Sequence, residues 1–191
     1  MALNSDQHGS VAPKYSSNNV QIDQDVFDYG FSYFKKYIFY VFITIPFIIY
    51  FKLYLNVILF LVLFIPLRKY LGGYHFNNDV ICILFSSFVS IAISYYSNIC
   101  NISYLYYIFS TIAILLLSYF LAPVEHKNKE LNSYEKKIYK FKAIKIEIIF
   151  LFFSVLAYIF SINTLINLLF YINIINIFNL IIGNLLNEKC Q

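Results

Sequence analysis

The stretch VICILFSSFVSIAISYYS, residues 80–97, runs for 18 positions without a charged side chain. As an α-helix it rises about 27 Å, close to the roughly 30 Å hydrocarbon core of a bilayer. A second apolar run follows at 103–122, after an uncharged hinge that contains Asn98 and Asn101. Both runs are long enough to span a membrane, so this pair predicts an all-α polytopic membrane protein.

The composition of the whole chain supports this class. Of its 191 residues, 60% are hydrophobic and 13% charged, and the mean hydropathy is +0.67, which is far from the average of soluble domains. The 21 Phe and 19 Tyr suit lipid-facing and interfacial positions. The three cysteines have no paired spacing, which argues against a disulfide framework or a zinc knuckle. We expect a lipid bilayer as partner and no nucleic acid.

The chain begins with a polar stretch, residues 1–18, that has no apolar signal-peptide core. We predict a disordered leader there, native or not, then one helical membrane domain at 19–185 and a polar tail at 186–191. The domain opens with IDQDVFDYGFSYFKKY, in which Phe27, Phe31 and Phe34 recur at helical spacing. This pattern predicts an amphipathic helix at the membrane surface.

Two further pairs of apolar runs complete the domain. The first pair, 37–51 and 53–67, is divided by Lys52, and each run would rise only about 22 Å as a helix. These are either two short tilted spans or one re-entrant hairpin. The second pair lies at 146–162 and 164–183. The sequence therefore predicts an amphipathic helix and about six apolar helices.

The lysines predict the orientation of these helices. Seven lysines lie between Lys127 and Lys145, in a stretch that the sequence predicts to be a polar loop. Short loops rich in Lys and Arg stay in the cytoplasm. Counting spans back from this loop places the polar break at 68–79 on the same, cytoplasmic side.

That break contains a cluster of reactive side chains. If the chain is helical from about His75 onward, then His75, Asp79 and Cys82 lie on one stripe. A cysteine nucleophile needs a neighbouring base, and a third group can orient the imidazole. The alternative is a loop with solvated His and Asp and a Cys that serves as a small apolar residue. A metal site is the weaker alternative, because residues at this helical spacing rarely all reach one ion.

The residues just before the cluster add to this pattern. The neighbouring glycines Gly72 and Gly73 disfavour a continuous helix and permit positive φ or close approach of another backbone. Arg68, at the apolar boundary beside Lys69, either anchors to lipid phosphate or pairs with a substrate carboxylate.

RKYLGGYH at 68–75, with Cys82 seven residues later and LAPVEHKNKEL at 121–131, resembles the accessory gene regulator B (AgrB) family. These are membrane peptidases of Gram-positive bacteria that process quorum-sensing propeptides of the AgrD type. The resemblance implies that His75 and Cys82 are the catalytic pair and that Arg68 and Gly73 are required. The family has no fixed carboxylate at Asp79, so its orienting role rests on helical spacing alone. The motif after the fourth run maps to Ala122, Pro123, Val124, Lys127 and Asn128.

The resemblance implies a cysteine endopeptidase of the bacterial cell membrane with its site at the cytoplasmic face. It would remove the C-terminal tail of an AgrD-like propeptide and form a thiolactone or lactone through an acyl-enzyme, without a cofactor. The rival interpretation is a non-enzymatic membrane scaffold or transporter accessory protein. A homodimer is open, since Asn173, Asn176 and Asn179 could form hydrogen bonds across a dimer interface.

Overall fold

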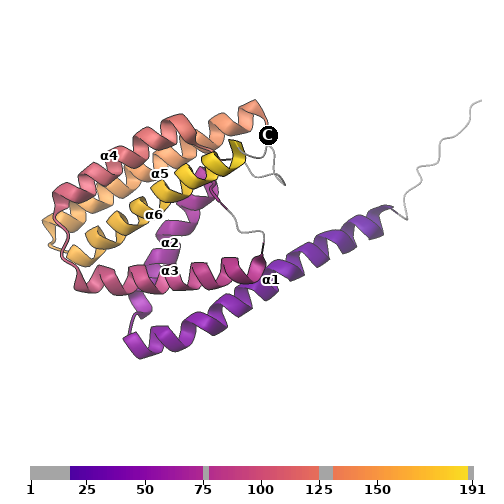
Figure 1. The fold of residues 1–191 in the computed structure, drawn as a ribbon, viewed down its shortest axis with the longest axis horizontal. Helices are drawn as coiled ribbons and strands as arrows, with labels where there is room; N and C mark the ends of the chain where they lie inside the picture. Colours follow the sequence, from indigo (N-terminus) through magenta and orange to yellow (C-terminus); the bar gives the residue numbers. More distant parts are fainter. Residues whose placement is uncertain (1–17, 75–77, 125–130, 189–191) are drawn as a thin grey trace, which may run out of the picture. The chain divides into compact units, whose positions relative to one another are not determined.

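The computed structural model describes residues 18–74, 78–124 and 131–188. The elements in these ranges are helices (Figure 1), as the sequence predicts. They are α1 (Asn18–Phe51), α2 (Tyr54–Leu71), α3 (Asp79–Ile99), α4 (Tyr104–Leu121), α5 (Ser133–Ile159) and α6 (Asn163–Glu188). The predicted leader before residue 18 lies outside the described residues.

The chain divides into two units, residues 1–38 and 39–191. In the first, the predicted amphipathic pattern appears as exposed Phe27, Phe31 and Phe34 side chains. The Phe27 and Phe31 rings stack with their centroids 6.0 Å apart, and the Lys35 ammonium lies 4.5 Å from the Phe31 centroid.

The predicted separation between this helix and the first apolar run is wrong. α1 continues from Asn18 to Phe51 as one helix. No glycine or proline occurs between Phe31 and Ile45, so nothing in this part of the sequence interrupts the helical hydrogen bonds.

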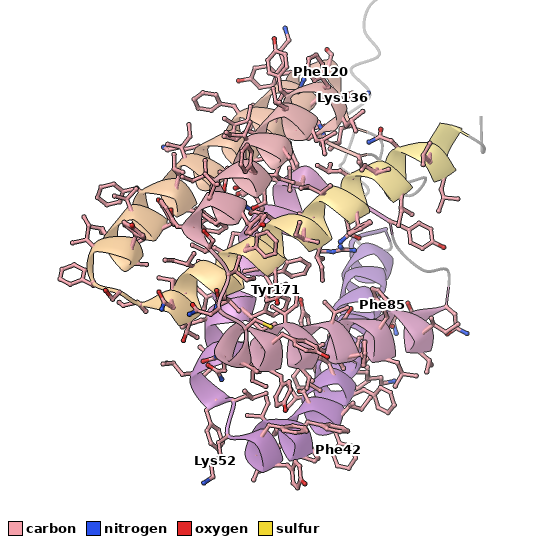
Figure 2. The ribbon with its side chains drawn as sticks, turned by 60° about the vertical axis from the view of Figure 1, so that its left-hand side comes forward. Phe42, Lys52, Phe85, Phe120, Lys136 and Tyr171 are labelled. Atoms are coloured by element: carbon pink, nitrogen blue, oxygen red, sulfur yellow. The ribbon has the colours of Figure 1, made fainter. Side chains whose placement is uncertain are left out.

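Within the described residues, five helical segments are long and apolar enough to cross a membrane. They are Gly30–Phe51, Tyr54–Leu71, Asp79–Ile99, Tyr104–Leu121 and Asn163–Leu186. The first two, at 22 and 18 residues, are longer than the runs the sequence suggested, because both helices continue past the apolar boundaries. Lys52, in the turn between them, lies at the opposite end of the bundle from Lys136 (Figure 2). This arrangement agrees with two spans better than with a re-entrant hairpin.

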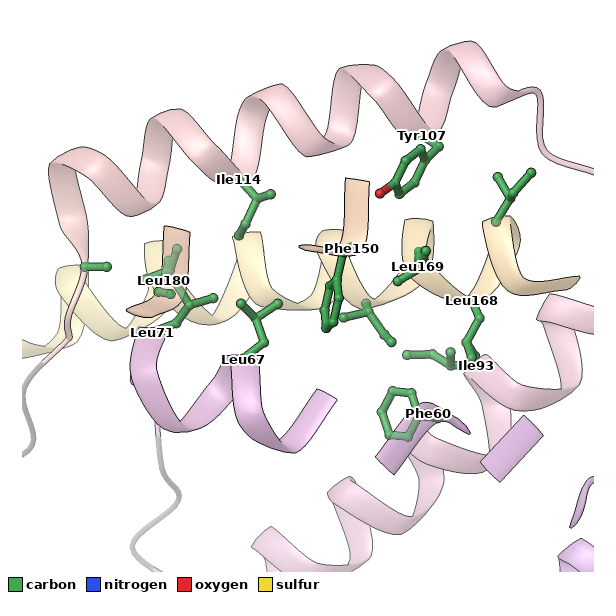
Figure 3. Close-up of a cluster of buried hydrophobic side chains, with 14 of the residues drawn as sticks. Phe60, Leu67, Leu71, Ile93, Tyr107, Ile114, Phe150, Leu168, Leu169 and Leu180 are labelled. Atoms are coloured by element: carbon green, nitrogen blue, oxygen red, sulfur yellow. The ribbon is translucent and has the colours of Figure 1, made fainter. Parts of the chain in front are cut away.

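The core of the second unit lies around α6, which packs against α2, α3, α4 and α5. Leu67 and Leu71 of α2 lie toward Ile114 of α4 and Leu180 of α6, while Leu169 lies further along α6, near Tyr107 (Figure 3), and these side chains are fully buried. Large aromatic side chains such as Phe42, Phe85 and Phe120 project outward instead (Figure 2). An apolar exterior over a packed interior is the pattern of a helix bundle in lipid.

The predicted seven-lysine loop is largely helix. α5 begins at Ser133 and carries five of the seven lysines. Its start is fixed by a capping box, in which the Asn132 backbone N–H donates to Glu135 Oε2 at 3.0 Å. Lysine is a good helix former, so a run of lysines after this cap extends α5 instead of forming a loop.

Asn173 and Asn176 of α6 lie in the interior of the bundle and not on a surface that could form a dimer interface. Asn173 and Asn176 are each 1% exposed. Asn173 Nδ2 donates to Thr111 Oγ1 at 3.0 Å, which joins α6 to α4, and Asn176 Nδ2 donates to the Ile172 carbonyl. The suggestion that they bind a second copy of the chain is therefore wrong, and the homodimer stays untested.

Candidate active site

The predicted site residues gather where α2 ends and α3 begins. Arg68 and Lys69 lie in the last turn of α2, and Gly72 caps that helix. Cys82 lies near the start of α3. His75 falls in the gap at 75–77, outside the described residues, so its predicted catalytic role stays a prediction.

Gly72 makes a contact that only glycine allows. Its φ is +73°, and a Cβ atom built there would lie 2.3 Å from the Val124 carbonyl oxygen. The contact is a short parallel bridge to the segment after α4, in which the Val124 N–H donates to the Leu71 carbonyl at 2.9 Å. The predicted close approach of another backbone at Gly72 is thus confirmed.

Gly73 and Gly183 bring α6 against the same loop. The φ of Gly73 is +139°, and a Cβ there would lie 3.1 Å from the Asn179 Cβ. A Cβ at Gly183 would meet Val124 Cγ1 at 2.8 Å and the Gly73 carbonyl carbon at 3.2 Å. The segment entering the predicted site is therefore held between Val124 and α6.

Arg68 projects into this region, and whether it also contacts a lipid phosphate or a substrate carboxylate stays untested. Its Nη2 donates to the Tyr74 carbonyl oxygen at 2.8 Å, and its guanidinium carbon lies 5.8 Å from the Phe64 ring centroid. The Cys82 thiol lies near enough to interact electrostatically with this guanidinium. Arg68 thus holds the loop backbone at Tyr74 and lies within electrostatic range of Cys82.

Cys82 and Asp79 are positioned by the N-terminus of α3. Asn78 is the N-cap, extended in backbone, and its Oδ1 accepts the Val80 N–H at 2.9 Å. The helix therefore begins at Asp79, and helical spacing relates Asp79 to Cys82, while His75 lies outside the described residues. Asp79 is exposed in the first turn, where a negative charge suits the helix dipole.

Aromatic and basic side chains cover the same end of the bundle. The Tyr70 and Tyr139 ring centroids are 5.5 Å apart, and the ammonium groups of Lys142 and Lys69 lie 5.2 and 5.8 Å from the Tyr70 centroid. This basic surface, built from α2 and α5, lies one turn or less from Arg68 and Gly72 along α2.

The sequence did not reveal every residue that shapes this region. Gly183 lies far along the chain in an apolar run, and only an unexpected glycine inside a helix could have drawn attention to it. The Tyr74 carbonyl, which Arg68 binds, is a backbone group and leaves no trace in the sequence. Within the described ranges no three His, Cys, Asp or Glu side chains are grouped to hold a metal ion. Because His75 lies outside them, the metal alternative stays untested.

Comparison with known proteins decides the family. The accessory gene regulator B family model matches residues 10–186. The chain belongs to the AgrB family. Among curated relatives, two AgrB-like proteins of Clostridium perfringens are similar to it. The one from strain 13 / Type A is 33% identical over 122 residues, which is 60% of this chain and 57% of the relative. The one from strain SM101 / Type A is 32% identical over 121 residues, 59% of this chain and 56% of the relative.

The alignments thus span just over half the length of these AgrB relatives. No solved structure matches the chain. The family match covers the Arg68 to Cys82 segment and all of α2 to α5. With its apolar helices, the chain is a multi-pass membrane protein of the AgrB family.

Proposed function

We propose that this AgrB protein is a membrane cysteine endopeptidase that trims an AgrD-like quorum-sensing propeptide. The observation that carries the proposal is that Arg68 and Cys82 lie within electrostatic range of each other beside a backbone loop held at Gly72 and Gly73. A guanidinium near a cysteine favours the thiolate, which is the nucleophilic form of cysteine. The motif resemblance assigns the role of base to His75.

The first chemical step is acyl transfer to the enzyme. His75 takes the Cys82 thiol proton, and the thiolate attacks the carbonyl carbon at the propeptide's processing site. The peptide C–N bond breaks, the proton passes from His75 to the leaving amine, and the C-terminal tail departs. A thioester then joins the Cys82 sulfur to the remaining peptide.

The second step returns the enzyme to its starting state. A thiol within the bound propeptide attacks the thioester carbonyl and displaces the Cys82 thiolate, which recovers a proton. One thioester replaces another, so the exchange needs no ATP, and the internal thiol has a high effective concentration relative to water. A propeptide that offers a serine hydroxyl instead gives a lactone.

The basic surface around Tyr70, Lys69 and Lys142 suits an acidic propeptide tail at the cytoplasmic face. The exposed phenylalanines of the first unit suit an amphipathic propeptide helix that shares the membrane surface. Each feature, taken by itself, supports a propeptide that is acidic at its C-terminus and amphipathic at its N-terminus.

A trapped acyl-enzyme tests this function directly. The membrane protein is incubated with a propeptide whose internal cysteine is replaced by alanine, so that the second step cannot proceed. We expect the peptide fragment to accumulate on the proteolytic fragment that contains Cys82, as a hydroxylamine-labile adduct seen by mass spectrometry.

Cys100 provides the matched control, because it is a free thiol at the other end of α3. The adduct should form in Cys100→Ala and be absent from Cys82→Ala. An adduct on Cys100, or tail removal by hydrolysis in the Cys82→Ala variant, would exclude Cys82 as the nucleophile.

The contribution of Arg68 has its own test. In Arg68→Gln the Tyr74 carbonyl loses its charged hydrogen-bond donor and the Cys82 region loses a positive charge, so we expect the rate of tail release to fall about tenfold. Asp79→Asn, on the exposed first turn of α3, should leave the rate of tail release within about twofold, because an exposed charge at a helix N-terminus contributes little. A strong effect of Asp79→Asn with no effect of Arg68→Gln would restore the orienting carboxylate and contradict our assignment.

A further inference from the structure

Glu147 of α5 is a carboxyl group in the interior of the bundle. Its side chain is 0% exposed, and neither Oε1 nor Oε2 has a hydrogen-bond partner among the described residues. An ionised carboxylate in such surroundings costs several kcal/mol unless it is paired. Some partner must therefore neutralise this group.

Other unpartnered oxygen atoms lie at the same level of the bundle. α5 and α6 pack together and are joined by a short turn. Glu147 precedes the end of α5 by 12 residues, about 18 Å, while Asn173 and Asn176 follow the start of α6 by 10 and 13 residues, about 15 and 20 Å. The Oδ1 atoms of both asparagines are buried without a hydrogen bond.

Tyr107 brings α4 to the same cluster. It is 0% exposed, it interacts electrostatically with Glu147, and its hydroxyl lies beside those of Ser154 and Thr111 without forming a hydrogen bond of good geometry. Thr111, one turn later on α4, accepts from Asn173 Nδ2 at 3.0 Å. Three helices thus direct polar side chains toward one layer of the interior.

The hydrogen atoms of this cluster do not suffice for its oxygens. The amide groups of Asn173 and Asn176 already donate, to the α4 hydroxyls and to the Ile172 carbonyl respectively. The two carboxyl oxygens, the two amide oxygens and the Tyr107 hydroxyl then share two hydrogens, that of Tyr107 and the second amide hydrogen of Asn176. A hydrogen on the carboxyl group would supply a further donor and remove the buried charge at once.

No positive side chain is placed to do this instead. On α2, residues 55–67 carry no ionisable group, and on α6 the residues at this level are asparagines and apolar side chains. Tyr107 is the titratable group that α4 contributes, and the neighbouring lysine on α5, Lys145, is exposed. Glu147 therefore has no cation among the described residues that pack around it.

We propose that Glu147 is a proton-binding site in the interior of the bundle, where its neutral carboxyl group donates a hydrogen bond to an oxygen atom of the Tyr107, Asn173 and Asn176 cluster. The proton comes from water by simple transfer to the carboxylate. Uptake of this proton also favours insertion of α5 into the membrane. Residues 142–159, the last 18 of α5, contain three charged residues, and Glu147 is the third of them. With Glu147 neutral, that segment carries only two charges, both near its start, and resembles the other spans.

Infrared spectroscopy of the purified full-length protein in lipid vesicles tests the proposal. At neutral pH we expect the C=O stretching band of a protonated carboxyl group, shifted in deuterium oxide. The band should vanish in Glu147→Gln, which keeps a neutral hydrogen-bond donor of nearly the same size. It should persist in Glu135→Gln, the matched control on the exposed first turn of α5.

Variants that keep the carboxyl group give a second test. Asn173→Ala and Asn176→Ala each remove one acceptor oxygen, and at least one of them should shift the band. Absence of the band in the wild-type protein at neutral pH would overturn the proposal, as would a band that survives Glu147→Gln or that neither asparagine variant moves. A band that appears only after Na⁺ and K⁺ are removed would assign the site to a metal cation instead and would also overturn it.

Discussion

Replacing Cys82 by alanine should abolish release of the propeptide's C-terminal tail, a loss of at least about 10³-fold in rate. The reason is that the acyl-enzyme cannot form without the sulfur nucleophile, and water attacks a peptide carbonyl far more slowly. The measurement follows tail release by mass spectrometry in cells that express the propeptide together with the enzyme. Membrane insertion of each variant is checked in the same cells.

Cys100→Ala serves as the control, because it removes a free thiol from the same helix. It should retain wild-type activity. His75→Ala is expected to lose about 10² to 10⁴-fold, the usual contribution of a general base. If tail release persists in both the Cys82 and the His75 variant, the rival scaffold or transporter accessory function becomes the better account of the protein.

Gly72→Ala should lower the stability of the protein more than any other glycine-to-alanine substitution in the loop at Gly72 and Gly73. The new Cβ would lie 2.3 Å from the Val124 carbonyl oxygen, at a φ of +73° that alanine rarely adopts. Relieving the overlap breaks the hydrogen bond from Val124 to Leu71, so we expect a loss of about 2–4 kcal/mol. Thermal unfolding of the purified protein in detergent measures this loss, and peptidase activity should fall with it.

Gly30→Ala is the matched control, since a Cβ at this helical position meets nothing within 4 Å. It should be neutral or stabilising by up to about 1 kcal/mol. Equal stability of the Gly72→Ala and Gly30→Ala proteins would mean that the bridge to Val124 does not hold the loop.

The helices of this protein were predictable because lipid imposes a simple rule on sequence. An uncharged run such as 80–97 has few alternatives to a spanning helix, and α3 occupies nearly that range. The boundaries were less predictable where charge and propensity conflict. The lysines after Ser133, which predicted a polar loop, belong to helix α5. Lys35 and Lys36, which predicted a break between two helices, lie inside the continuous helix α1.

The candidate site was predictable where its chemistry is local. Arg68, the two glycines and Cys82 stand within 15 residues, and their residue types indicate their use. What the sequence could not indicate depends on distant contacts: the pairing of Leu71 with Val124, the approach of Gly183, and the burial of Glu147. Each is set by how helices far apart in the chain pack, which periodicity within one helix does not determine.

The pairing of Leu71 with Val124 also sets the order in which the site can be completed during synthesis. Ribosomes extend the chain from its N-terminus, so Arg68 and Cys82 are present long before Val124 is added. A nascent chain that ends within α4 carries the reactive side chains without the partner that holds Gly72. Gly183 comes later still, near the end of α6. The growing chain therefore carries Cys82 early but completes the contacts of the Gly72 and Gly73 loop only when almost the whole chain has been made.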